Sequence, residues 1–311
     1  MKDFYPEGML IGTPENRHAL SSRERLTAAA NSEKILEGTV VMCDTAHDLI
    51  VDLGIMRGVI PRVEGAVGIA EGTTRDIALI SRVGKAVSFV ITGFAADARG
   101  RTYAQLSRRK AQEKCRRQFL SHLSVGDVID AKVTHLETFG AFCDIGCGNA
   151  ALLPIDSISV SRISHPKDRF CVGDNIRVAV KCIENGKITL TMKELLGTWQ
   201  ENADLFTAGQ TVTGVIRSIE EYGIFVELTP NLAGLAEPRP DVYIGSRACV
   251  YIKSINPEKM KIKLVLIDSF ESEEKTPIRY FFEGDHIDEF DYSPENSYKC
   301  IRSCFCEEKA P

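Results

Sequence analysis

The chain has 311 residues, of which 44% are hydrophobic and 26% are charged. These fractions are those of folded globular proteins, so they exclude a wholly disordered chain, and the length favours two or three domains. The longest apolar runs fall far short of the roughly 20 residues that cross a bilayer, and residues 1–8 lack the apolar core of a signal peptide. We therefore expect a cytoplasmic protein without membrane contacts.

The formal net charge of −5 is unevenly distributed along the chain. Between Asp268 and Glu295 ten acidic residues stand against only Lys275 and Arg279, so this segment has a charge of −8 and +3 is left for the rest. An acidic end therefore masks a mildly basic body. We predict that residues 269–311 form an acidic, disordered tail.

The chain contains ten cysteines, but no two of them have the C-x-x-C spacing of a zinc site. Cys300, Cys304 and Cys306 form only a loose cluster, without a second pair of ligands nearby in the sequence. We expect reduced thiols that mostly pack as small apolar side chains, with no metal ion and no cofactor.

One pattern occurs three times. Residues 126–154 align without gaps with residues 209–237, at a constant offset of 83. The matched pairs include Gly126 with Gly209, Phe139 with Tyr222, Gly140 with Gly223, Phe142 with Phe225, Asp144 with Glu227, and Leu152 with Leu235. A weaker copy lies upstream, between Gly38 and Leu106. The repetition predicts three similar structural units.

Within a copy, apolar and polar residues alternate, as in Ile129-Asp130-Ala131-Lys132-Val133, which is the period of a half-buried strand. Glycines and the Asn185-Gly186 pair separate these runs as turns. Each copy holds about five short strands, and such a small sheet protects its edges best by closing into a barrel. We predict an all-β chain of three tandem five-stranded barrels.

Segments with helical spacing of apolar residues separate the copies and predict short helical linkers. The expected parts are a partly helical N-terminal extension (1–33), a divergent first barrel (34–107), a basic helical linker (108–123), a second barrel (124–193), a second helical linker (194–207), a third barrel (208–268) and the tail (269–311). The lone Trp199 is expected to pack the second linker onto a barrel rather than to stack on a base.

The phrase Phe139-Gly140-Ala141-Phe142-Cys143-Asp144 resembles the S1 RNA-binding domain, an oligonucleotide-binding (OB-fold) barrel that is repeated in the bacterial ribosomal protein of that name. Tyr222-Gly223-Ile224-Phe225-Val226-Glu227 is a second match, and the first copy is a weaker one. The resemblance implies three tandem S1-type OB-fold domains that bind single-stranded RNA.

The aromatic residues of these phrases are the first candidates for RNA contacts. With Cys143 in the core, strand alternation leaves Phe142 outside the barrel, close to Phe139, and Tyr222 and Phe225 repeat this arrangement. Exposed rings suit stacking on unpaired bases, which contributes about 1–3 kcal/mol per base whatever the sequence. The alternative is that these rings pack in the core or between domains.

Phosphates require cations near the rings. The family places a basic residue on the last strand of the barrel, and the matching positions here are Lys187 and Lys261. Further candidates in the second and third barrels are Lys132, Arg162, His165, Lys167, Arg169 and Lys263. The alternative for these charges is an ordinary solvated face.

The first copy departs from the family, because His47 and Ile50 stand where the other copies have rings. Ribosomal members of the family use N-terminal domains to dock onto ribosomal protein. The resemblance therefore implies either a docking module for the small ribosomal subunit or a weak RNA site. The candidate residues for it are His47, Arg101, Arg108 and Arg109.

Enzyme motifs are missing from the sequence, which has no P-loop, no nucleophile elbow and no H-E-x-x-H, and its six histidines are scattered. We expect no catalysis and no small-molecule substrate. Two functions remain. One is a ribosome-associated factor in translation that holds single-stranded messenger or ribosomal RNA. The other is an adaptor that uses protein contacts in an RNA-processing or stress-response complex. Removal of the rings distinguishes them, because only RNA binding depends on stacking.

Overall fold

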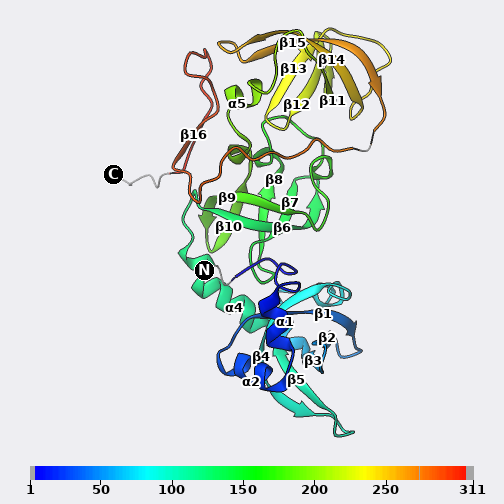
Figure 1. Ribbon diagram of the computed structural model, residues 1–311, viewed down its shortest axis with the longest axis vertical. Helices are drawn as coiled ribbons and strands as arrows, with labels where there is room; N and C mark the ends of the chain where they lie inside the picture. The colour runs from blue at the N-terminus through cyan, green and yellow to red at the C-terminus, as the bar shows by residue number, and fades with distance from the viewer. Residues whose placement is uncertain (1–3, 273, 306–311) are drawn as a thin grey trace. The chain divides into compact units, whose positions relative to one another are not determined.

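The computed structural model describes residues 4–272 and 274–305. In this part of the chain, three closed five-stranded barrels follow one another, as the sequence predicted (Figure 1). Barrel 1 contains β1 (Leu36–Cys43), β2 (Leu49–Asp52), β3 (Arg57–Ile60), β4 (Ala86–Ala96) and β5 (Thr102–Ser107). Barrel 2 contains β6 (Val128–Glu137), β7 (Gly140–Asp144), β8 (Ala150–Pro154), β9 (Asn175–Glu184) and β10 (Lys187–Thr191). Barrel 3 contains β11 (Thr211–Glu220), β12 (Gly223–Thr229), β13 (Leu232–Ala236), β14 (Arg247–Asn256) and β15 (Lys261–Phe270).

All three barrels close in the same way. Counting strands within a barrel, the order around the wall is 1-2-3-5-4, and the third strand runs parallel to the fifth. In barrel 3 this parallel contact pairs Leu235 with Lys263. A bulge between Ile216 and Ser218 bends the first strand, so that one strand can serve two sides of a small barrel. This is the OB-fold arrangement that the resemblance implied.

The cores follow the period-two pattern of the sequence. In β7, Cys143 is completely buried, whereas the neighbouring Phe142 is only half-buried because it faces outward. In barrel 3, Ile262 and Leu264 are buried while Lys261 and Lys263 are exposed. The alternation therefore places aromatic and basic side chains on the outside of barrels 2 and 3.

Short helices connect the barrels. Two helices precede barrel 1, α1 (Pro14–Leu20) and α2 (Arg23–Asn31), and Thr13 and Ser22 cap their amino ends. The remaining helical segments are η1 (Arg62–Glu64), α3 (Ile77–Ile80), α4 (Arg108–Gln118), η2 (Leu120–His122), η3 (Ile155–Ser157), η4 (Pro166–Asp168), η5 (Lys193–Leu196) and α5 (Trp199–Ala203). Both expected linkers between barrels are thus helical over much of their length.

The second linker is packed onto barrel 3. Thr198 and Glu201 form a capping box at the start of α5. Trp199 is 3% exposed and belongs to the apolar core cluster of barrel 3. The prediction that this ring packs the linker onto a barrel is confirmed.

The acidic C-terminal segment differs from the disorder that its charge suggested. Residues 274–305 follow a defined path in which β16 (Glu289–Asp291) pairs with β17 (Arg302–Cys304). Tyr292 is 6% exposed, and its hydroxyl donates a hydrogen bond of 2.6 Å to the carbonyl of Asn231. The physical reason is that apolar residues are interleaved with the acids and find buried positions, which a charge count does not register.

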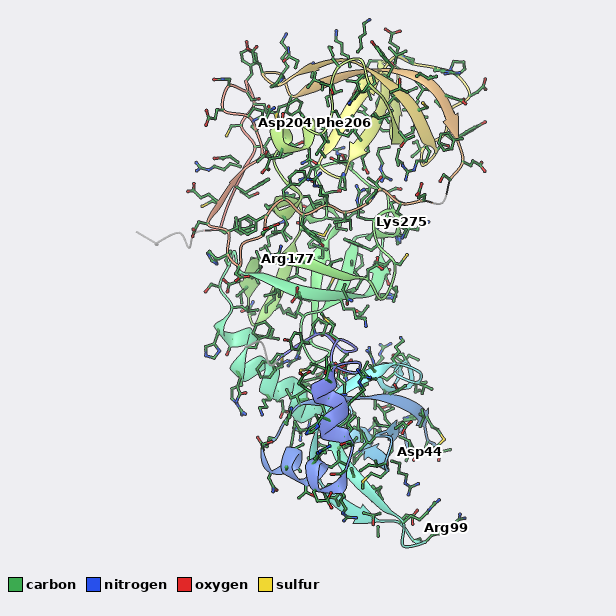
Figure 2. All side chains as sticks on the ribbon, in the orientation of Figure 1. Asp44, Arg99, Arg177, Asp204, Phe206 and Lys275 are labelled. Carbon is green, nitrogen blue, oxygen red and sulfur yellow. The ribbon has the colours of Figure 1, made fainter. Side chains whose placement is uncertain are left out.

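Basic residues of the body hold this segment in place. The guanidinium of Arg177 donates to the carbonyls of Phe282 and Gly284, at 2.8 and 2.9 Å. The ammonium of Lys275 donates to the carbonyl of Phe170 at 2.6 Å. Figure 2 labels Arg177 and Lys275 among all the side chains. The expectation of disorder for residues 306–311, and the thiol of Cys306, lie outside the described residues.

Among the described residues, none of the helices is long and apolar enough to cross a membrane.

Candidate nucleic-acid interface

Barrels 2 and 3 carry the same pair of aromatic rings in the same geometry. The ring centroids of Phe139 and Phe142 are 6.1 Å apart, with an interplanar angle of 90°. Those of Tyr222 and Phe225 are also 6.1 Å apart, with an angle of 88°. Phe139 and Tyr222 are 54% and 67% exposed, respectively, while their partners are half-buried. Edge-to-face contact orients each pair and leaves ring surface open to solvent.

A glycine between the two rings brings the next strand close behind them. A Cβ on Gly140 would lie 2.5 Å from the carbonyl oxygen of Leu153, and one on Gly223 would lie 2.6 Å from that of Ala236. Both contacts are with backbone, which cannot move aside as a flexible side chain can. The Phe-Gly and Tyr-Gly steps are therefore required by the packing that presents the rings.

In barrel 3, the strand register extends the ring pair into a row that ends in a cation. Phe225 pairs with Leu235 across β12 and β13, and Leu235 pairs with Lys263 across β13 and β15. In barrel 2, Leu152 pairs with Thr189 in the position of Lys263. The two rows thus share their apolar part and differ in the charge at the end.

The two lysines carried over from the family occupy equivalent positions at the start of the last strand. Lys187 pairs with Glu184 across the hairpin of barrel 2, and Lys261 pairs with Asn256 across that of barrel 3. Both side chains are exposed, as is Lys263. In the part of the chain that the structure describes, these three ammonium groups form no ion pair within 4.0 Å. Their charge is available to phosphates.

One ring beside the pair of barrel 2 was missed by the sequence analysis. His135 on β6 stacks on Phe142, with centroids 6.4 Å apart and an interplanar angle of 28°. Its side chain is 63% exposed, and its Nε2 lies 2.7 Å from a carboxylate oxygen of Glu137. The offset of 83 places Ser218 at this position in barrel 3, and Ser218 pairs with Phe225. The position of His135 on the first strand of the barrel was the sequence signal that could have identified this ring.

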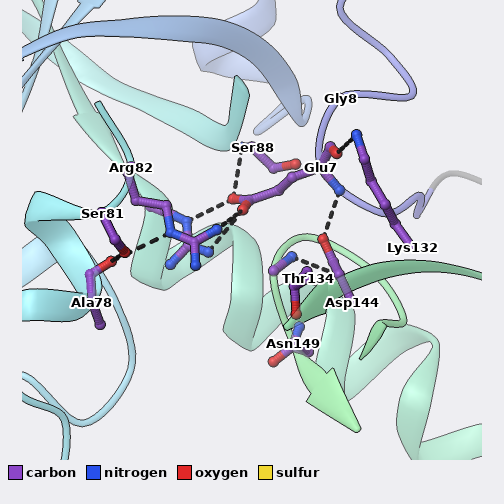
Figure 3. Close-up of polar contacts among 12 residues, drawn as sticks. Glu7, Gly8, Ala78, Ser81, Arg82, Ser88, Lys132, Thr134, Asp144 and Asn149 are labelled. Atoms are coloured by element: carbon purple, nitrogen blue, oxygen red, sulfur yellow. Dashed lines mark hydrogen bonds and ion pairs between the residues drawn. The ribbon is translucent and has the colours of Figure 1, made fainter. Parts of the chain in front are cut away.

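The remaining cations predicted for barrel 2 have different surroundings. Lys132 is half-buried, and its Nζ donates to the backbone carbonyl of Glu7 at 3.0 Å (Figure 3). His165 caps η4, since its Nδ1 accepts a hydrogen bond of 3.0 Å from the amide of Lys167. Arg162 and Lys167 are exposed. Arg162 and Lys167 are therefore the fully exposed cations of the basic loop.

The prediction of Arg169 as an RNA contact requires correction. Arg169 is 2% exposed, and its guanidinium donates to both carboxylate oxygens of Glu227, at 2.6 and 2.8 Å. Arg217 donates to the same carboxylate at 2.8 and 3.1 Å. Burial alone would raise the pKa of Glu227, but these two guanidinium groups hold that pKa below its ordinary value. A buried carboxylate needs cationic partners, and the guanidinium of Arg169 is one of them, so it does not face RNA.

Barrel 1 has an aliphatic row where the other barrels have rings. Ile50 pairs with Met42 on one side and with Val59 on the other, and Val59 pairs with Gln105. Met42 is 51% exposed. The absence of rings at these positions, predicted from the sequence, removes the stacking platform from this face of barrel 1.

The four candidates in and after barrel 1 do not form one cluster. The Nδ1 of His47 lies 3.3 Å from Asp76, and Arg101 is an exposed cation paired with Asp97 at 2.9 Å. Arg109 pairs with Glu64 at 2.7 Å and with Glu113 at 2.8 Å. Each of these three side chains already has a carboxylate partner.

Arg108 is a second correction, because it lies in the interior. It is 3% exposed, and its guanidinium donates to both carboxylate oxygens of Glu7, at 2.6 and 2.9 Å. Figure 3 shows Glu7 at the centre of this network, with Arg82, Ser88 and Asp144 around it. Burial would raise the pKa of Glu7, but Arg108 and Arg82 keep it below its ordinary value. Arg108 therefore stabilises the fold and has no free surface for docking.

Asp144 occupies the position of Glu227 but is held by amides rather than by guanidinium groups. Its carboxylate accepts hydrogen bonds from the backbone N–H of Glu7 at 2.7 Å, of Gly146 at 2.8 Å and of Gly148 at 2.9 Å. Burial, with the nearby charge of Glu7, raises the pKa of Asp144 to about 7. No group of three or more His, Cys, Asp or Glu side chains is arranged to hold a metal ion among residues 4–272 and 274–305.

Parts of this chain are similar in sequence to known proteins. Residues 122–193, which contain barrel 2, match the family described as the S1 RNA binding domain. The chain is 29% identical over 274 residues to the small ribosomal subunit protein bS1 of Leuconostoc lactis. This match covers 79% of this chain and 60% of the relative. It is 29% identical over 256 residues to the bS1 homolog of Bacillus subtilis, with coverages of 78% and 63%. The chain thus spans about 60% of the length of these relatives.

A solved structure from Streptococcus pneumoniae, described as a multidomain protein with nucleic acid binding domains, is also similar. It is 14% identical, covers 78% of this chain and 76% of its own, and gives a TM-score of 0.26.

Proposed function

We propose that this chain, which is similar to ribosomal protein S1 and is built from three S1-type barrels, binds single-stranded RNA and acts in translation. The observation that carries the proposal is the repeated ring pair. Two barrels present rings at the same separation and angle, beside exposed lysines. Large rings that face water indicate a binding surface. The same geometry in two barrels argues against a chance feature of one barrel.

The chemistry of the two sites suits unpaired nucleotides. Each ring offers a face to a base, and stacking of this kind contributes about 1–3 kcal/mol per base with little dependence on sequence. Lys187 in barrel 2, and Lys261 and Lys263 in barrel 3, supply positive charge for the phosphates. We infer that Phe139, Phe142, Tyr222 and Phe225 hold the bases while these lysines hold the backbone.

The names of the relatives support a setting for this binding. The two relatives described above are named small ribosomal subunit protein bS1 and its homolog. We propose that the chain associates with that subunit in the cytoplasm and holds messenger or ribosomal RNA there. Barrel 1, which lacks the rings, then serves as the contact with the subunit or as a weaker RNA site.

A second function is favoured by one observation on barrel 1. Val41 and Met42 on β1 and Ile77 on α3 are 55%, 51% and 64% exposed, so large apolar side chains of this part of the chain face solvent. Such a surface suits protein contacts, as in an adaptor within an RNA-processing or stress-response complex. In that case, partner binding would survive removal of the ring pairs of barrels 2 and 3.

The proposal is tested by titrating a labelled, unstructured RNA with the full chain. Phe142→Ala/Phe225→Ala should weaken binding by about 2 kcal/mol or more, or roughly 30-fold, because both barrels lose a stacking platform. The matched control is Tyr298→Ala, which removes a ring that is 82% exposed and lies outside both pairs. Unchanged affinity in the double variant, or an equal loss in the control, would show that the ring pairs are not the RNA site.

A further inference from the structure

The outer face of β14 and β15 in barrel 3 exposes a continuous apolar surface. Tyr251, Val265 and Ile267 are 39%, 44% and 48% exposed. Tyr251 pairs with Val265 on β15 and with the exposed Thr211 on β11. These four residues, which we call the β14 patch, therefore extend across three neighbouring strands. Large apolar side chains gathered on one face of a small barrel indicate a binding surface.

The equivalent face of barrel 1 is covered by a helix. Val90 on β4 pairs with Ser107 on β5, as Tyr251 pairs with Val265, and it is 4% exposed. Ser107 caps the amino end of α4, whose Ala111 and Cys115 form one buried cluster with Val90. Helix α4 thus covers in barrel 1 what barrel 3 leaves open.

The equivalent face of barrel 2 is covered as well. Ala179 on β9 is completely buried and forms one cluster with Val128 on β6 and with Leu195 of η5. Ile287 and Phe305 of the C-terminal segment complete that cluster. In two of the three barrels, therefore, a helical segment that follows the last strand packs small or aliphatic side chains onto this face.

Barrel 3 lacks such a cover because its last strand does not end where the others do. Strands β5 and β10 end at Ser107 and Thr191, and a helical segment begins one or two residues later. Strand β15 is ten residues long and extends past Val265, the position equivalent to Ser107, as far as Phe270. The chain beyond it then packs on barrel 2, where Tyr280 joins the cluster of Ala179. The segment that could have covered the β14 patch is used elsewhere.

We propose that the β14 patch docks an amphipathic helix of a partner protein, which presents small or aliphatic side chains to Tyr251, Val265 and Ile267. The covers of barrels 1 and 2 define the shape of this partner. Charge defines its flank, because Lys253 is exposed beside the patch and forms no ion pair within the described part of the chain. The docked helix carries carboxylates on that side.

The composition of the patch favours a protein over RNA as its occupant. Tyr251 is its single ring, and Val265 and Ile267 offer no face on which a base could stack. Aliphatic side chains gain free energy when a complementary apolar surface covers them. The surface is also separate from the ring pair, because Tyr251 lies on β14 while Tyr222 and Phe225 lie in and beside β12.

The test uses the full chain and two fluorescent peptides of residues 108–123, the segment that contains α4. One peptide has the natural sequence. In the other, Arg109, Lys110, Lys114, Arg116 and Arg117 are replaced by glutamate. A lactam staple on the solvent side holds both as helices, because short helices are marginal in water. Both keep Ala111 and Cys115, so they share the apolar face and differ in charge.

We expect the acidic peptide to bind at least about tenfold more tightly than the natural one. Val265→Asp should weaken its binding by at least about tenfold, and the milder Tyr251→Ser should weaken it less. Val172→Asp is the matched control, because Val172 is a 59% exposed apolar residue on the loop before β9 of barrel 2, and it should leave peptide binding unchanged. Fluorescence of Trp199, which lies in the core cluster of barrel 3, verifies that each variant folds.

Three results would overturn the proposal. The first is no binding of the acidic peptide at concentrations up to about 1 mM. The second is equal binding by the folded Val265→Asp variant. The third is a loss of affinity for unstructured RNA in Tyr251→Ser without any effect on the peptide, which would assign the patch to the RNA path. That result would leave the ring-pair site intact, since the ring variants test it separately.

Discussion

Barrels 1 and 3 share a fold and a register but not the row of side chains on the outside. The row from the first to the fifth strand contains Met42, Ile50, Val59 and Gln105 in barrel 1, and Ser218, Phe225, Leu235 and Lys263 in barrel 3. The backbone therefore provides the same platform twice. In the proposed function, the ring and the cation that replace two neutral side chains make the platform of barrel 3 suitable for RNA, so the difference lies in the row and not in the barrel.

A second comparison concerns one buried carboxylate position in barrels 2 and 3. Glu227 is completely buried and faces two guanidinium groups, whereas Asp144 is 3% exposed and accepts three backbone N–H groups. The pKa of Glu227 is lowered and that of Asp144 is raised to about 7. The same position thus holds a permanent charge in barrel 3 and a titratable one in barrel 2.

The largest expected effect is the removal of the charge in barrel 3. Glu227→Gln leaves the buried Arg169 without its counter-charge, and breaking a buried ion pair in this way costs about 3–5 kcal/mol. Urea unfolding followed by the fluorescence of Trp199, the one tryptophan of the chain, reports this loss for barrel 3. Glu237→Gln, at an exposed position, should leave the midpoint unchanged. A loss below about 1 kcal/mol would mean that the pair is solvated in solution.

The next effect is the removal of one ring from the pair of barrel 3. Phe225→Ala should weaken RNA binding by about 1–3 kcal/mol, because its ring stacks directly on a base. In the full chain, the intact pair of barrel 2 remains, so the loss falls at the lower end of that range. The titration should use an RNA long enough to reach both barrels and a short one that fills a single site. A loss confined to the long RNA would fit two linked sites, and no loss with either would contradict stacking at Phe225.

Titration of Asp144 should produce a smaller effect with a defined pH window. Its pKa is raised from the ordinary value near 4 to about 7, so the folded chain retains a proton that the unfolded chain releases. Stability should therefore fall as the pH rises from about 4 to 7 and should level off above that. In Asp144→Asn this fall should be missing, so it should appear in the difference between the two proteins.

Hydrogen exchange of the amides of Gly146 and Gly148 provides the measurement, because both donate to Asp144. Their protection in the natural chain should decrease between pH 5 and 7 relative to the variant, after correction for the intrinsic exchange rate. A constant difference across that range would show that Asp144 does not titrate there and would contradict a pKa near 7.

The smallest effect is an exchange of the charge that distinguishes the two rows. Lys263→Thr gives barrel 3 the residue of barrel 2, and Thr189→Lys does the reverse. For single-stranded nucleic acid, the slope of log affinity against log salt should change by about 0.7 for each phosphate contact. We expect the slope to become shallower in the first variant and steeper in the second. Unchanged slopes in both would remove Lys263 from the RNA path.

Much of the fold could be predicted from the sequence, because repetition and a period of two are local properties. The offset of 83 identified both ring pairs, and alternation placed Cys143 inside and Phe142 outside. The basic loop could not be resolved in the same way. Arg162, Lys167 and Arg169 look alike in a charged run, yet Arg169 alone meets the buried Glu227 of another barrel.

Two further features needed the structure for a similar reason. The defined path of residues 274–305 depends on buried sites offered by barrels that are distant in the sequence, as for Tyr292 at Asn231. The third ring of barrel 2, His135, depends on a strand pairing that brings it to Phe142. In both cases long-range packing, and not local propensity, decides the outcome.

Mapping where RNA touches the full chain tests most directly whether the ring pairs bind RNA. A short unstructured RNA that contains 4-thiouridine is cross-linked by light, and the modified peptides are identified by mass spectrometry. The account predicts cross-links at Phe139 or Phe142 in barrel 2 and at Tyr222 or Phe225 in barrel 3, with none at Ile50. Cross-links confined to barrel 1, or to faces of barrels 2 and 3 away from the ring pairs, would contradict it.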